Sequence, residues 1–366
     1  MRKAAKIVAL NVCVFIGLFF AVILIISVAA DLVAVANIFL RTGDGRGRDQ
    51  LPMFAASNPA PGLFEEQRET VSVYESIVGW KKAPYEGEYV NIDENGRRTH
   101  TIGLDNLPSA KDVGFFGGST MWGTGVVDNG TIPAHFDSMT DNYRVTNYGQ
   151  RGWRIRQSLA ELVNLYDQGE LPDIAIFYAG TNDAAIGCDL AFGPGLNETH
   201  EAPYMREMVS NRESPSYLYR NFIVPAWDTF KRLSGRQRVE SDRQCDVDPE
   251  RAEQVALSTF RNWQLAKLIM ESEGREFYAF LEPVAAVGQP NLSYLELNPD
   301  ILAQYPPVYQ RLQELIAAEG DGWAFDISDA LDGDNQYYLD HSHISDEGNA
   351  VIAQRILAEL QRVQTQ

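Results

Sequence analysis

The hydropathy pattern begins with a long apolar stretch. Residues 7–30 contain no charged side chain and follow Arg2, Lys3 and Lys6. At a rise of 1.5 Å per residue, a helix of this length crosses a bilayer core of about 30 Å. A cleaved signal peptide begins with similar charges, but its apolar core is only about 7 to 15 residues long. The pattern therefore favours a single transmembrane anchor.

The charges around this stretch predict its orientation. Basic residues before a transmembrane helix favour a cytoplasmic N-terminus, although Arg41, Arg46 and Arg48 beyond it weaken that bias. We therefore expect a cytoplasmic start and anchor over residues 1–40, with the rest of the chain outside the cytoplasm. Residues 41–62 are rich in Gly, Pro, Arg and Asn, which predicts a linker.

Beyond residue 110, short β-rich runs alternate with helical patterns. The strand candidates are VGFF, YRVTN, DIAIFY, REFYAFL and WAFDIS. The helical patterns cover residues 132–139, 154–169, 251–273, 301–319 and 347–363. This alternation predicts an α/β fold with a parallel sheet and helices on both faces. In such sheets ligands bind at the carboxyl ends of the strands.

Two segments depart from this alternation. Residues 63–110 are predicted to be an N-terminal extension that packs on the domain formed by residues 111–366. Residues 184–250 are rich in Gly, Pro, Asn and charge, and we interpret them as an insertion that lies over the site or forms a solvated loop. Cys188 and Cys245 lie near its two ends. Outside the cytoplasm they could form a disulfide, and otherwise they are two separate thiols.

The charge of the chain narrows the range of partners. Lys and Arg total 31 against 50 Asp and Glu, a formal net charge of −19 at pH 7. Such a surface repels phosphate backbones, so we do not expect a nucleic-acid partner. Anionic lipid headgroups would not attract it either.

The first candidate for chemistry is Ser119, in FFGGSTMWGTG at the end of the first strand. Gly117 and Gly118 allow a tight turn, and a serine there presents its hydroxyl at the ligand-binding edge. Phosphate-binding loops also join glycines to a serine, but neither GxGxxG nor GK[ST] is present. The absence of GxSxG argues against the nucleophile elbow of α/β-hydrolases.

Two further motifs follow the second and third strands. NYGQRGW contains Gly149 and Gly152, and YAGTND contains Gly180 and Asn182. A glycine offers an unobstructed backbone N–H, and an asparagine can donate a side-chain N–H into the same pocket. Taken alone, these motifs are equally typical of ordinary turns before a helix.

The fourth motif, LDHSHISDEG, lies between the last strand and the closing helix. Asp340 can accept from one imidazole nitrogen of His343, three residues on, while the other nitrogen faces outward, as a general base requires. His341 directly follows Asp340, so we expect it at the pocket rim. A metal site would have to use these three residues, and no other histidine has ligand spacing to them. We therefore expect neither a metal nor a cofactor.

In order and strand-end placement, the four motifs resemble the blocks of the SGNH (GDSL-like) hydrolase family over about residues 111–364. The resemblance implies a flavodoxin-like three-layer α/β/α sandwich. It also implies an active site with Ser119 as nucleophile, His343 and Asp340 as the base pair, and an oxyanion hole formed by Ser119, Gly152 and Asn182. The family commonly has Asp where this chain has Gly118, so the resemblance indicates no particular subfamily.

The function implied by this resemblance is a serine esterase that forms an acyl-enzyme on Ser119. Its expected substrates are short acyl groups on surface glycans or lipids, within reach of a domain anchored to the bilayer. If a sugar hydroxyl replaces water as acceptor, the same site gives an O-acyltransferase. Two alternatives from other classes are a non-catalytic domain that binds acylated glycans and a structural membrane protein that recruits partners.

Overall fold

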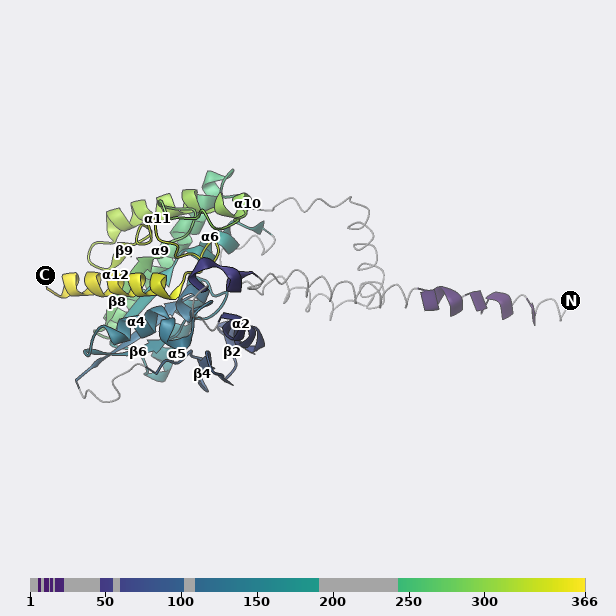
Figure 1. Ribbon diagram of the computed structural model, residues 1–366, viewed down its shortest axis with the longest axis horizontal. Helices are drawn as coiled ribbons and strands as arrows, with labels where there is room; N and C mark the ends of the chain where they lie inside the picture. Colours follow the sequence, from purple (N-terminus) through teal and green to yellow (C-terminus); the bar gives the residue numbers. More distant parts are fainter. Residues whose placement is uncertain are drawn as a thin grey trace. The chain divides into compact units, whose positions relative to one another are not determined.

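The computed structural model describes residues 47–54, 60–101, 109–190 and 243–365, together with positions 6, 7, 10–12, 14, 15 and 17–22 (Figure 1). By its contacts the chain divides into two units, Met1–Asp44 with Tyr204–Glu240, and Gly45–Pro203 with Ser241–Gln366. In the first unit, the described positions are helical and exposed.

Two predictions, the membrane anchor and the insertion, lie partly outside these residues. Among the described positions, no helix is long and apolar enough to cross a membrane. Half of the anchor predicted over residues 7–30 falls on positions that the structure does not describe, and so does most of the insertion predicted over residues 184–250.

Five parallel strands form the central sheet of the second unit. Their spatial order is β6-β5-β7-β8-β9. Their bounds are β5 (Lys111–Gly117), β6 (Tyr143–Asn147), β7 (Ile174–Ala179), β8 (Glu276–Leu281) and β9 (Ala324–Asp326). Counted along the chain, this order is 2-1-3-4-5, the flavodoxin-like arrangement. The predicted α/β class with a parallel sheet is confirmed for these residues.

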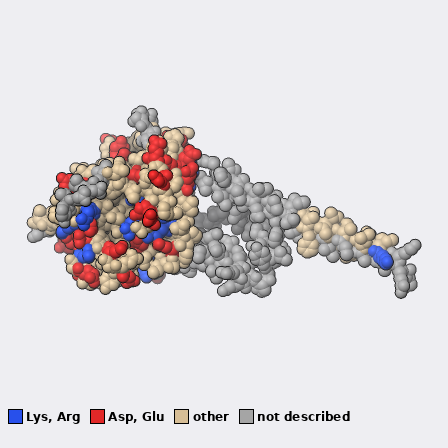
Figure 2. Space-filling view, turned by 90° about the horizontal axis from the view of Figure 1, so that it is seen from below, with Lys and Arg blue, Asp and Glu red and all other residues tan. Residues whose placement is uncertain are grey.

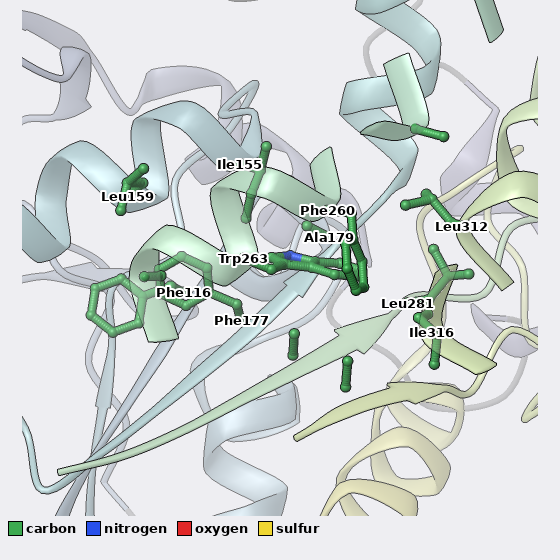
Figure 3. Packing of buried hydrophobic residues seen from close by; sticks show 14 of the residues in the cluster. Phe116, Ile155, Leu159, Phe177, Ala179, Phe260, Trp263, Leu281, Leu312 and Ile316 are labelled. Atoms are coloured by element: carbon green, nitrogen blue, oxygen red, sulfur yellow. The ribbon is translucent and has the colours of Figure 1, made fainter. Parts of the chain in front are cut away.

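Helices cover both faces of this sheet because its strands are apolar on both sides. Phe116 and Phe177 belong to one core cluster, and Phe115 and Ile176 belong to another. Strands covered on both faces contain nearly continuous apolar runs, and every residue of β7 is buried. The first cluster, drawn in Figure 3, joins β5, β7 and β8 to three helices: α5 (Ile155–Gln168), α9 (Pro249–Ser272) and α11 (Tyr305–Glu319). The second is closed by α4 (Ile132–Ser138) and α12 (Asp346–Gln364).

The helix predicted over residues 301–319 is instead two helices, α10 (Pro299–Leu302) and α11. Pro306 and Pro307 stand in the first turn of α11. Proline has no N–H to donate and its φ suits a helix start, so the sequence begins a new helix there. The remaining short helices of the domain are α3 (Ser119–Trp122), η3 (Asp128–Gly130) and α6 (Thr181–Gly187).

The residues before β5 pack against the sheet edge. They form α2 (Ala60–Glu69), β1 (Ser72–Glu75), β2 (Gly79–Lys82), β3 (Tyr85–Glu86) and β4 (Asn91–Ile92). Arg98 pairs with Asn147 of β6 through an isolated bridge. Its buried guanidinium donates to the carboxylate of Asp128 and to the carbonyls of Gly123 and Val126. One side chain therefore holds the loop that follows α3.

An aromatic contact holds the segment that precedes α2. Within residues 41–62, the described positions form η1 (Arg48–Gln50), η2 (Pro52–Phe54) and the start of α2. Phe54 contacts Phe64 of α2 edge-to-face, with ring centroids 5.5 Å apart.

Cys188 and Cys245 form a disulfide, which confirms the first of the two alternatives for these residues.

Candidate active site

The predicted site residues follow the carboxyl ends of the strands. Ser119 begins α3 directly after β5, and Asn182 lies in the first turn of α6 after β7. Asp340 and His343 lie between β9 and α12. In a 2-1-3-4-5 sheet the chain reverses its strand order at the first and third strands, here β5 and β7, and ligands bind in the crevice outside that point. Ser119 and Asn182 therefore lie at the edge where a ligand is expected.

Three of these side chains form one hydrogen-bonded chain. His343 Nε2 is 2.8 Å from Ser119 Oγ, and His343 Nδ1 is 2.7 Å from Asp340 Oδ2. A carboxylate can only accept, so Nδ1 donates to Asp340 and Nε2 is left to accept from the serine hydroxyl. Asp340 Oδ1 accepts from the backbone N–H groups of Ser342 and His343, both at 2.8 Å. The imidazole is thus held in the tautomer that a general base needs.

Charges around Asp340 keep it ionised. Burial by itself opposes the charge, but His343, Arg48 and His341 together hold the pKa of Asp340 well below its ordinary value. A permanently charged carboxylate is suited to stabilise an imidazolium on His343.

The turn between Asp340 and His343 explains their spacing. Leu339 N donates to His343 O at 2.7 Å, which closes the turn and brings Asp340 back over the ring. Ser345 then caps α12 by accepting from Gly348 N.

His341 lies apart from this turn, with its Nδ1 4.0 Å from Asp340 Oδ1 and its side chain about one-third exposed. Burial lowers the pKa of His341. Of the two histidines, His343 is the one bonded to Ser119.

The predicted oxyanion donors gather around the nucleophile turn. Asn182 Nδ2 donates to Trp153 O at 2.7 Å, which leaves its second N–H for a ligand. Gly152, next to Trp153, has φ of 79°, a conformation that favours glycine. A Cβ placed on Gly118 would lie 2.5 Å from Asn182 Nδ2 and 3.1 Å from Trp153 O. A side chain at position 118 would therefore require the Asn182 amide to move.

Two residues of this region were missed by sequence reasoning. Arg48, from the segment predicted as a linker, donates to the same oxygen of Asp340 that accepts from His343. Glu282, directly after β8, is buried beside the turns that carry Ser119 and Asn182. No local signal marks Arg48, which lies 292 positions before Asp340. Glu282 does have one, because it is an acidic residue at the carboxyl end of an apolar run.

A metal site, a separate cavity and a charged surface are the other kinds of place where a ligand could bind. Among the residues that the structure describes, no group of three or more His, Cys, Asp or Glu could hold a metal ion. A cavity of about 380 Å³ lies between the β1–β2 hairpin and α5, and its lining includes Lys81, Arg97 and Glu161 but no residue of the hydrogen-bonded chain. On the face shown in Figure 2, acidic side chains are scattered over the larger unit with basic ones among them.

Comparison with known proteins finds likeness in structure alone. No family model and no curated protein matches the sequence. Among solved structures, the chain is similar to a lipolytic protein of the G-D-S-L family from Veillonella parvula (13% identity, 68% of this chain and 97% of that one, TM-score 0.38). It is also similar to a carbohydrate acetylesterase family member from Sinorhizobium meliloti (12% identity, 70% of this chain and 100% of that one, TM-score 0.37). A third similar structure is an α/β hydrolase from the Lake Arreo metagenome (16% identity, 69% of this chain and 95% of that one, TM-score 0.37). Likeness at this level carries no argument about activity.

Proposed function

We propose that this chain is a serine esterase of the SGNH type. One observation carries the proposal: Ser119 Oγ, His343 and Asp340 form a continuous hydrogen-bonded chain at 2.8 and 2.7 Å. Nucleophile, base and orienting carboxylate at such distances are the recognised arrangement of an activated serine. Their place at the ligand-binding edge of the sheet supports the assignment.

The reaction follows from these roles. Ser119 Oγ bonds to the ester carbonyl carbon while His343 Nε2 takes the hydroxyl proton, and Asp340 stabilises the imidazolium. The oxyanion accepts from the N–H groups of Ser119 and Gly152 and from the amide of Asn182. His343 then protonates the leaving alcohol, which leaves an acyl group on Ser119. Water then attacks the acyl carbon as His343 takes a proton from it, and His343 returns that proton to Ser119 Oγ as the bond to the acyl group breaks and the acid leaves.

The proposed substrates are short acyl groups on glycans or lipids, since small acyl groups demand least of the pocket. If the acyl-enzyme is intercepted by a sugar hydroxyl instead of water, the same machinery acts as an O-acyltransferase. Adding a saccharide acceptor to the assay below separates the two outcomes, because acyl transfer yields an acylated sugar instead of free acid.

The proposal extends to location. Residues 7–30 anchor the chain in a bilayer, with the domain outside the cytoplasm. The Cys188–Cys245 disulfide supports this, since disulfides persist in oxidising compartments. Protease added to spheroplasts should digest the domain, and a domain that stays protected until the cells are lysed would reverse the topology.

The test of activity is acetate release from p-nitrophenyl acetate and from an acetylated saccharide by the purified full-length chain. Ser119→Ala should abolish release, whereas Ser272→Ala, which alters an exposed serine on α9, should not. A Ser119→Ala protein that retains the wild-type rate would refute the assigned nucleophile.

A further inference from the structure

The nucleophile and the proposed oxyanion donor come from different loops, and one buried carboxylate connects those loops. Glu282 follows β8 and is 3% exposed. Its Oε2 accepts from Thr120 Oγ1 at 2.7 Å, and its Oε1 accepts from Thr181 N at 2.8 Å. Thr120 directly follows Ser119, and Thr181 directly precedes Asn182. The carboxylate is therefore bonded to the chain neighbour of each.

The backbone that carries Glu282 is itself held in the sheet. Glu282 N donates to Ala179 O at 3.2 Å, at the end of β7. Gly180, which joins β7 to α6, packs so closely that a Cβ there would lie 2.8 Å from Leu281 Cδ1 and 3.0 Å from the Tyr309 hydroxyl. The carboxylate thus projects from a well-packed part of the sheet, which lets it transmit position to both loops.

Burying a carboxylate at this position between the two loops costs free energy. Burial raises the pKa of Glu282 to about 7, while the bonds from Thr120 and Thr181 favour the charged form. An apolar side chain would fill the same volume without that cost. Costly buried acids concentrate at functional sites, where the geometry they impose has a use.

We propose that Glu282 is a positioning residue that holds Ser119 and Asn182 at the separation that acyl transfer requires, through its bonds to Thr120 and Thr181. The inference rests on the proposed esterase function. Glu282 does not touch the substrate. Because misplacing a reacting group by about 1 Å can cost on the order of 100-fold in rate, its loss should lower kcat and leave KM nearly unchanged.

The experiment compares four variants of the full-length chain by kcat and KM for p-nitrophenyl acetate and by melting temperature. Glu282→Gln turns an amide N–H toward one of the two donors, so we expect kcat to fall at least 10-fold with KM within twofold. Thr120→Val removes one donor and should also lower kcat, whereas Thr120→Ser keeps the hydroxyl and should restore it. Glu161→Gln is the matched control, a buried glutamate on α5 that is bonded to Lys81. It should leave kcat unchanged even if the melting temperature falls.

The outcomes separate this inference from the proposed function. If the wild type turns over, Ser119→Ala is inactive, and both Glu282→Gln and Thr120→Val keep wild-type kcat, the positioning role is wrong and the esterase assignment stands. If Glu282→Gln does not fold, Thr120→Val and Thr120→Ser decide alone, and equal kcat in these two overturns the inference. A wild type without turnover on any ester overturns both.

Discussion

Replacing Glu282 with glutamine should flatten the pH dependence of the free energy of unfolding. In an unfolded chain this carboxyl titrates near its ordinary value of 4.5, whereas burial raises its pKa to about 7 in the fold. One pKa unit corresponds to about 1.4 kcal/mol, so the fold disfavours the ionised form by about 3 kcal/mol.

The direction in which stability changes with pH follows from the number of protons that each state binds. Between pH 4.5 and 7 the folded state binds more protons at this site than the unfolded state, so stability falls as pH rises. The contribution is fully present below pH 4.5 and is lost above about pH 7. Glutamine does not titrate, so the stability of wild type minus that of Glu282→Gln should fall by about 3 kcal/mol between pH 4 and pH 8.

Urea unfolding followed by tryptophan fluorescence, with the disulfide intact, measures this difference at each pH. Taking the difference between the two proteins cancels the titration of every group they share. A difference that stays constant within about 0.5 kcal/mol across the range would refute the reasoning, because it would mean that folding leaves the proton affinity of Glu282 unchanged.

Four other substitutions, one of them with a matched control, test the residues around the site and the fold that supports it. His343→Ala should lower kcat by about 10⁴-fold or more, and His341→Ala by less than about 10-fold, since only the former is bonded to Ser119; steady-state kinetics on both decides which is the base. Arg98→Ala should destabilise the fold by about 3 to 5 kcal/mol in urea unfolding, because it leaves the carboxylate of its partner without the buried cation. Arg48→Ala should raise kcat/KM about fivefold, an effect on the order of 1 kcal/mol, because this cation opposes the imidazolium formed during reaction. Arg68→Ala, on the exposed side of α2, is its control, and equal effects of the two would show a general charge effect.

The positions of the candidate site residues could be predicted because parallel strands end at a common edge. Ser119 and Asn182 each follow an apolar run, so an alternating pattern suffices to bring them to the same side of the sheet. The pair Asp340 and His343 is local, three residues apart within one turn, and needs only that turn to form. Sequence order and strand ends therefore contain most of the information about this chain of hydrogen bonds.

The contacts that adjust the site could not be predicted in the same way. Arg48 reaches Asp340 from a segment whose composition indicates a linker, and the packing of Phe54 on Phe64 helps to hold that segment on the domain. Glu282 lies between two turns because β8 adjoins β7 and β7 adjoins β5, an order that no local pattern encodes. Gly118 is visible in the sequence, but the approach of the Asn182 amide to it is visible only in three dimensions.

The carboxyl ends of the strands thus carry two buried acids in opposite environments. Cations and backbone N–H groups surround Asp340, which keeps its pKa low, whereas burial raises the pKa of Glu282 to about 7. Only an acid that stays ionised throughout the working pH range can supply a constant countercharge to an imidazolium, so that role falls to Asp340. Glu282 exchanges its proton near neutrality and is bonded to a hydroxyl and a backbone amide instead of an imidazole. Its environment therefore suits it to hold loops in place and excludes it as the partner of the base.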